Sequence, residues 1–195
     1  MGTRTQTSLL SESEQQAVNQ SRFENLQPQT ILNQQEITDW KDKVANFQMS
    51  VKTEPTMQQA CLFEQTSNPA DDIDPFALPQ QNTEFWRWQF SDVGVAALYF
   101  VIDYHSELLL YVGETVKSNQ RWKGEHDCKR YLLNYRQAHY HHNLESQLGI
   151  AFWRHAPAEQ RPRQKVESAL IYKWRSPFNK ENWKFWGTPF IGVSK

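Results

Sequence analysis

Two short apolar runs that lie close together place the strongest constraint on how this chain folds. Residues 97–103 have the sequence ALYFVID and residues 108–113 have the sequence LLLYVG. Both runs are rich in the β-branched and aromatic side chains that favour strands. The polar segment 105–107 between them is short enough to form a turn. Two strands with so short a connection pair antiparallel, so the sequence predicts a β-hairpin.

Further elements are expected after this hairpin. A helix capped at residue 118 or 119 continues through residue 135, and residues 148–154 form a third strand. Residues 157–174 form a helix that Pro177 ends. One face of this helix carries Val166, Leu170 and Trp174. The order strand, strand, helix, strand, helix predicts an α/β (α+β) domain in which helices flank a small three-stranded antiparallel sheet.

The first half of the chain differs from the second in composition. Residues 1–85 contain 5 Lys and Arg against 12 Asp and Glu, whereas residues 86–195 contain 16 against 10 and seven of the eight tryptophans. We therefore expect residues 1–85 to be an acidic, Gln-rich, largely disordered extension. Within it, helical spacing of apolar residues predicts a helix over 33–49, and residues 53–83 are interpreted as a linker. Residues 86–195 form the predicted domain, whose basic charge suits a phosphate-rich partner.

Several classes of protein are disfavoured by the sequence. The sequence contains no run of about 18 apolar residues, so no transmembrane helix is predicted. Its N-terminus has no basic segment followed by an apolar one, so no secretory signal is predicted. The two cysteines, Cys61 and Cys128, form neither a metal-binding pair nor a disulfide framework. These features predict a protein of the reducing cytoplasm with no membrane partner.

A set of motif elements recurs in a fixed order through the predicted domain. Arg121 follows Gly113 by eight residues, and Asn179 follows Glu167 by twelve. In order, the elements are Ala97-Leu98-Tyr99, Tyr111-Val112-Gly113, Arg121, Glu167 and Pro177-Phe178-Asn179. This arrangement resembles the GIY-YIG nuclease superfamily, which includes the incision domain of bacterial excision repair and several homing and restriction endonucleases. The resemblance covers roughly residues 95–180.

The resemblance implies a metal-dependent DNA endonuclease, a hydrolase of phosphodiester bonds that acts at the nucleoid. Glu167 would hold one Mg²⁺ or Mn²⁺ ion by oxygen ligation, as hard divalent ions prefer. Arg121 has the planar fork of donors that suits a phosphate. Tyr99 and Tyr111 would project from neighbouring strands, and we expect Tyr111 to be the base. The supporting residues would be Gly113, His126 and Asn179.

Three departures from the family pattern bear on catalysis. Ala97 replaces the first glycine, and Glu114 stands where excision-repair members carry a lysine. Glu125 occupies the position of a family His or Tyr, and His126 follows it, about 100° further around a helix. Taken singly, each site residue would also suit an ordinary structural role. These departures motivate an alternative, in which the chain is a catalytically weak or inactive DNA-binding module on the same fold.

Two further motifs lie outside this set. Residues 139–142 read HYHH, but their spacing matches no closed zinc site, so a solvent-exposed loop is the expectation. Residues 59–63 read QACLF, and Gln59, Leu62 and Phe63 resemble the short peptide by which bacterial DNA enzymes bind the replication sliding clamp. An interaction protein that acts through its N-terminal tail is therefore a third hypothesis. The DNA target, the pathway and the oligomeric state do not follow from the sequence.

Overall fold

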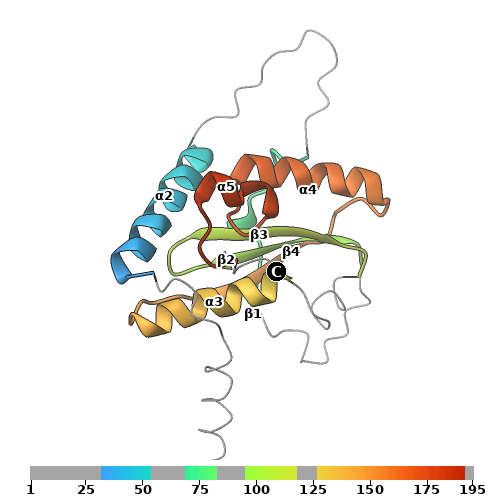
Figure 1. Ribbon diagram of the computed structural model, residues 1–195. Helices are drawn as coiled ribbons and strands as arrows, with labels where there is room; N and C mark the ends of the chain where they lie inside the picture. Colours follow the sequence, from blue (N-terminus) through green and yellow to red (C-terminus); the bar gives the residue numbers. More distant parts are fainter. Residues whose placement is uncertain (1–31, 54–68, 83–94, 118–126, 192–195) are drawn as a thin grey trace, which may run out of the picture. The chain divides into compact units, whose positions relative to one another are not determined.

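The computed structural model describes residues 32–53, 69–82, 95–117 and 127–191 (Figure 1). In chain order, the described elements are α2 (Gln34–Thr53), the 3-10 helix η1 (Pro75–Ala77), β1 (Gln80–Asn82), β2 (Ala97–Asp103), β3 (Leu108–Thr115), α3 (Asp127–His141), β4 (Leu148–Trp153), α4 (Gln160–Trp174), the 3-10 helix η3 (Lys180–Asn182) and α5 (Trp183–Trp186). These residues belong to one compact unit that begins at Leu32. Within them, no helix is both long enough and apolar enough to cross a membrane.

The sheet has four antiparallel strands in the order β1-β4-β2-β3, so the prediction of three strands was wrong. The additional strand pairs Gln80 with Ala151 and Asn82 with Gly149. Its sequence, QQN, has no apolar alternation. Backbone pairing with the edge of β4 forms this strand, and a search for hydrophobic periodicity does not detect such a strand.

The predicted hairpin is present as β2 and β3. The connecting turn contains Glu107 in a left-handed conformation, with φ of 50°. Pairing shifts by one residue between Val101 and Ile102, where Val101 lies opposite Tyr111 and Ile102 opposite Leu109. This bulge brings the neighbours Leu110 and Tyr111 into contact with the same core.

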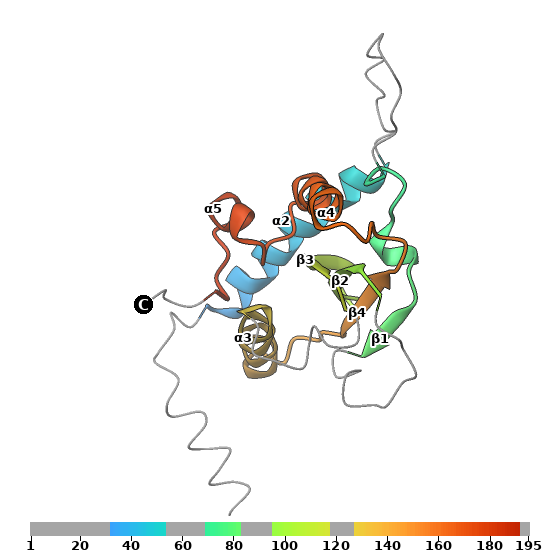
Figure 2. The same ribbon diagram turned by 90° about the vertical axis from the view of Figure 1, so that its right-hand side faces the viewer.

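Both faces of the sheet are covered, which explains why all seven residues of β2 are buried. One face carries Tyr99 and Val101 and packs against α3 and the first turns of α2. The other carries Leu98 and Phe100 and packs against α4. Figures 1 and 2 show α3 and α4 on opposite sides of the sheet. A strand covered on both faces appears in the sequence as a continuous apolar run, as 97–103 does.

The helix predicted over 33–49 is confirmed, but it is part of the folded core. Ile37 and Val44 of α2 are fully buried in the same cluster as the sheet residues. Asn33 and Glu36 form a capping box, in which each side chain accepts from the other's backbone N–H at 2.9 and 2.8 Å. The compact unit therefore begins at residue 32, and the predicted boundary at 85/86 falls inside it.

β3 is an edge strand, and two side-chain amides satisfy its outer backbone groups. Gln48 of α2 donates to the carbonyl of Leu109 at 2.9 Å and accepts from its N–H at 2.8 Å. Asn179 makes the same pair of bonds with Val112, at 2.8 and 2.9 Å. These amides take the place of a neighbouring strand, and they close an edge that would otherwise expose unpaired groups.

Candidate functional site

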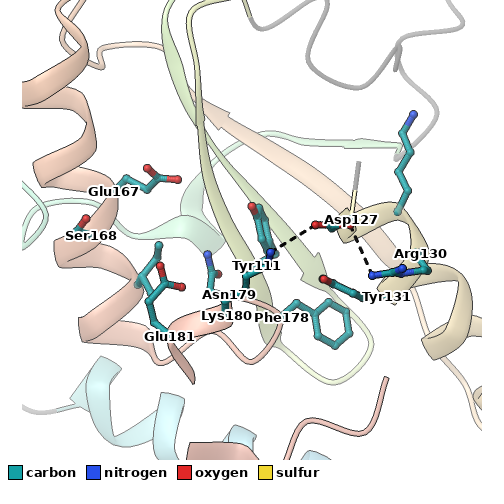
Figure 3. A pocket seen from close by; sticks show the side chains of 12 residues that line it. Tyr111, Asp127, Arg130, Tyr131, Glu167, Ser168, Phe178, Asn179, Lys180 and Glu181 are labelled. Atoms are coloured by element: carbon teal, nitrogen blue, oxygen red, sulfur yellow. Dashed lines mark ion pairs between the residues drawn. The ribbon is translucent and has the colours of Figure 1, made fainter. Parts of the chain in front are cut away.

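A cavity of about 840 Å³ lies beside β3, between α4, the start of α3 and the segment 178–181 (Figure 3). Tyr111 faces it from β3, and Glu167 reaches into it from α4. Asn179 lines it from the segment that follows α4. The structure thus brings three predicted site residues from three elements to one cavity.

The position of Glu167 follows from the pattern of α4. Val166 and Leu170 are buried against the sheet, as the spacing of apolar residues predicted. Glu167 is one residue, or about 100°, further around the helix from Val166, and this rotation turns it from the core to the cavity wall. It is partly buried there. A carboxylate at the wall of an open cavity suits a hydrated hard cation, which needs oxygen ligands and room for water.

The two predicted tyrosines occupy different positions. Tyr111 is partly exposed at the cavity, whereas Tyr99 is fully buried in the core. Their rings stack with centroids 5.9 Å apart and planes 28° apart. The ring of Tyr99 thus supports Tyr111 from the core side. Both tyrosines are predicted site residues, and of the two it is Tyr111 that lines the cavity.

Gly113 lies opposite Tyr99 in the hairpin register. A Cβ at position 113 would lie 2.7 Å from Cε1 of Tyr99 and still closer to its Cζ and hydroxyl oxygen. Any side chain there would push the ring of Tyr99 out of place. The glycine of the second motif is therefore required by the tyrosine of the first, and the two motif elements form one packing unit.

Asn179 anchors the segment after α4 to β3. In addition to its two bonds with Val112, its Oδ1 accepts from the hydroxyl of Ser176 at 2.6 Å. The backbone N–H of Phe178 donates to the carbonyl of Leu110 at 2.9 Å. These bonds flank Tyr111 on both sides in the sequence, so they fix the backbone from which its ring projects. The geometry fits the supporting role expected for Asn179.

Charged side chains of both signs surround the rest of the cavity. Asp127 is paired with Arg130 at 3.6 Å and with Lys180 at 3.7 Å, and all three side chains are more than half exposed. Exposed pairs of this kind stabilise a fold little. Arg130 and Lys180 can therefore exchange Asp127 for a phosphate at little cost.

Glu114, the departure from the family lysine, is bound to a buried arginine that the sequence interpretation missed. Nε of Arg163 donates to its carboxylate at 2.6 Å, and Arg163 is fully buried. Nη1 of Arg163 donates to the carbonyls of Pro157 and Ala158 at 2.9 and 2.8 Å. Arg163 lies three residues before Val166 on the apolar face of α4, and this position signals burial. Glu114 therefore holds β3 to α4.

The prediction of a solvent-exposed loop over residues 139–142 was wrong about the loop and about His139, whereas Tyr140 and His141 are exposed. α3 continues through His141, and His139 is buried, with Nδ1 2.8 Å from the carbonyl of Tyr135. Its Nε2 lies 3.0 Å from Nζ of Lys41, which is a donor, so the ring is neutral and carries its proton on Nδ1. Burial, opposed by the bond to Tyr135 and supported by the nearby Lys41, lowers the pKa of His139 below its usual value.

Several residues of the predicted site and the clamp-like peptide lie in the part of the chain that the structure does not describe. Arg121, His126 and the peptide with Gln59, Leu62 and Phe63 lie outside the described residues. Within the described ranges, no three His, Cys, Asp or Glu side chains are grouped closely enough to hold a metal ion. Among the described residues, Glu167 would therefore hold an ion at the cavity together with water or substrate oxygens, which is the manner in which Mg²⁺ commonly binds.

Comparison with known proteins gives no assignment: no family model, curated protein or solved structure matches the chain. A carboxylate, a phenol and two weakly held cations face one open space. This combination of groups suits a phosphate ester and an accompanying hard cation.

Proposed function

We propose that this protein is a metal-dependent DNA endonuclease of the GIY-YIG type. The observation that carries the proposal is that Tyr111 and Glu167, from separate motif elements on β3 and α4, face one cavity. The resemblance requires these two residues to meet, and the fold brings them to one cavity although they are 56 residues apart in the sequence. The four-stranded antiparallel sheet with helices on both faces is compatible with this proposal.

In the proposed reaction, Glu167 would hold one Mg²⁺ or Mn²⁺ ion. The bound ion would supply charge stabilisation for the phosphate oxygens and for the leaving oxygen. Tyr111 accepts the proton of the attacking water. A phenol with a pKa of about 10 is a weak base at neutral pH, so a nearby cation must assist it. Arg121 is the proposed partner for the phosphate, together with the cavity cations Arg130 and Lys180.

Tyr99 and Asn179 act as positioning residues in this proposal. Tyr99 supports the ring of Tyr111 from the core, and Gly113 leaves the space that this requires. Asn179 fixes the backbone beside Tyr111. Neither residue needs to touch the reacting atoms. The protein would be cytoplasmic and would act at the nucleoid, where its DNA substrate lies.

A second candidate is a DNA-binding module with weak or no catalysis. The pairing of Glu114 with Arg163 favours it, because a carboxylate held by a structural arginine cannot perform the part of the family lysine. Such a module would retain salt-sensitive DNA binding without cleavage.

A third candidate is an interaction protein that acts through the clamp-like peptide, which contains Gln59, Leu62 and Phe63. Because α2 belongs to the folded core, deletion of residues 1–85 would damage the fold, so Leu62→Ala with Phe63→Ala is the appropriate test.

The experiment is nicking of supercoiled plasmid in Mg²⁺ or Mn²⁺. Wild type should nick, and Glu167→Ala and an EDTA control should not. Glu145→Ala is the matched control, because Glu145 is an exposed carboxylate that does not line this cavity. Absence of nicking by wild type on plasmid, branched and damaged DNA would favour the binding module. Nicking that persists in Glu167→Ala would contradict the assigned metal ligand.

A further inference from the structure

Two large aromatic side chains are exposed on either side of an arginine where α4 meets α5. Tyr172 and Phe185 are 69% and 56% exposed. The guanidinium carbon of Arg175 lies 4.2 Å from the ring centroid of Tyr172 and 5.2 Å from that of Phe185. We call these three side chains the aromatic platform. An exposed alternation of aromatic ring, guanidinium and aromatic ring is the kind of surface on which nucleobases stack.

The platform rests on a rigid base. The indole N–H of Trp186 donates to the carbonyl of Arg175, and Nδ2 of Asn182 donates to the carbonyl of Ser176 at 3.1 Å. Trp186 also packs against Phe185 with centroids 4.7 Å apart. These contacts hold α5 beside the C-terminal end of α4, where Figure 1 also draws it. The exposed rings are therefore held in place before any partner arrives, which lowers the entropy cost of binding.

The backbone conformation at Arg175 is unusual for an arginine. Arg175 follows the last residue of α4 with φ of 47° and ψ of 43°, the left-handed conformation that glycine adopts most easily. An arginine at such a position strains the backbone. Such strain persists where the surrounding structure holds the residue, as the bond from the N–H of Arg175 to the carbonyl of Ile171 and that from its Nη1 to Oδ1 of Asn182 at 3.5 Å do here. The side chain that is retained here is the central member of the platform.

The platform continues from the candidate active cavity. Tyr172 follows Ser168 by four residues on α4, and Phe185 follows Glu181 by four residues, and both Ser168 and Glu181 line the cavity. From Gln160 to Phe190, apart from the buried Arg163, the chain contains six Lys and Arg against two Asp and Glu. A strand of nucleic acid that leaves the cavity along this surface would meet rings for its bases and positive charge for its phosphates.

We infer that the aromatic platform binds unpaired bases of single-stranded DNA next to the scissile phosphate. This inference deepens the proposed function and rests on it. It assigns as substrate a DNA with unpaired nucleotides, such as a flap, a bubble or a branch, and not a continuous duplex. In a duplex the bases are stacked on one another and are not available to the rings, so duplex DNA gains only the electrostatic part of the interaction.

The test is binding of a fluorescein-labelled single-stranded oligonucleotide and of the matching duplex, measured by anisotropy in EDTA. Without a divalent ion the assay reports binding alone. Tyr172→Ala and Phe185→Ala should each weaken binding of the single strand by about tenfold or more, and binding of the duplex much less. Tyr140→Ala is the matched control, because Tyr140 is 81% exposed on α3, away from the platform. It should leave both affinities unchanged.

Arg175→Gly separates binding from stability. It relieves the left-handed backbone while it removes the guanidinium, so it should weaken single-strand binding without lowering the melting temperature. A merely structural arginine would give the opposite result. Equal affinities in wild type and the three platform variants, or no binding of the single strand, would overturn the inference and would favour a protein partner for this surface. Because this assay contains no divalent ion and measures no cleavage, failure of the nuclease proposal is recognised separately, in the nicking experiment with Mg²⁺ or Mn²⁺.

Discussion

Removal of the Asn179 side chain should destabilise the protein in proportion to the groups that it leaves unpaired. Asn179→Ala strips partners from the N–H and the carbonyl of Val112 and from the hydroxyl of Ser176, and both of these residues are fully buried. An unsatisfied buried group costs about 1–3 kcal/mol. Water from the adjacent cavity can replace part of the loss, so we expect a decrease of about 2–4 kcal/mol in the free energy of unfolding.

Urea denaturation and thermal melting measure this loss. For a folded unit of this size the melting temperature should fall by roughly 5–15 °C. Gln164→Ala, an exposed position on α4, is the control and should change the free energy of unfolding by less than about 0.5 kcal/mol. If Asn179→Ala is as mild as this control, the amide does not close the edge of β3, and the argument for its positioning role fails.

The isosteric change Asn179→Asp sharpens the same test. A carboxylate still accepts from the N–H of Val112 and from Ser176, but it places a second acceptor against the carbonyl of Val112, where Nδ2 lies 2.8 Å away. Repulsion and burial raise its folded pKa above the unfolded value of about 3.9. The free energy of unfolding of the Asn179→Asp variant is therefore highest below the pKa of the unfolded aspartate, and it decreases as pH rises through the folded pKa. A stability difference from wild type that does not depend on pH would refute this account.

Three further perturbations test other parts of the structure by thermal melting. Gly113→Ala forces a Cβ against the ring of Tyr99 and should cost about 1–3 kcal/mol, and less in a Tyr99→Ala background, where the ring is gone. Glu114→Gln leaves the buried guanidinium of Arg163 without its counter-charge and should cost about 3–5 kcal/mol; a loss below about 1 kcal/mol would contradict the pairing. Burial lowers the pKa of His139, so the folded protein favours the neutral imidazole. The contribution of this imidazole to the free energy of unfolding is present above the unfolded pKa of about 6.5 and is lost as pH falls through the folded pKa. The melting temperature of wild type should therefore fall on acidification below about pH 6.5 and that of His139→Gln should fall less; parallel curves would refute this.

The sequence predicts best those parts of the fold that depend on local pattern. The hairpin over 97–113 and the apolar face of α4 are where periodicity and turn composition indicated, because β-branched runs and helical spacing leave a direct trace in sequence. β1 and the burial of α2 left no such trace. β1 exists because β4 offers an edge, and α2 is ordered by a distant sheet face, so neither follows from its own composition.

The candidate site shows the same division. The spacing of motif elements was enough to select Tyr111, Glu167 and Asn179, which the fold brings to one cavity. It could not show which of the two tyrosines is exposed, because the spacing does not reveal that Tyr99 lies on a central strand and Tyr111 on an edge strand. The burial of Arg163 could have been predicted, because it lies on the apolar stripe of α4. The aromatic platform could not, because Arg175 and Phe185 meet only through the packing of α5.

The central claim is that Glu167 and Tyr111 act together on one phosphodiester, and single-turnover cleavage of a labelled DNA in Mg²⁺ tests it most directly. Wild type is compared with Glu167→Gln, Tyr111→Phe and the double variant, each first shown to melt as wild type does. We predict that each single change slows cleavage by about 100-fold or more, and that the double variant is less than about tenfold slower than the slower single variant. Losses that multiply in the double variant, or full activity in either single variant, would contradict the claim that one site contains both residues.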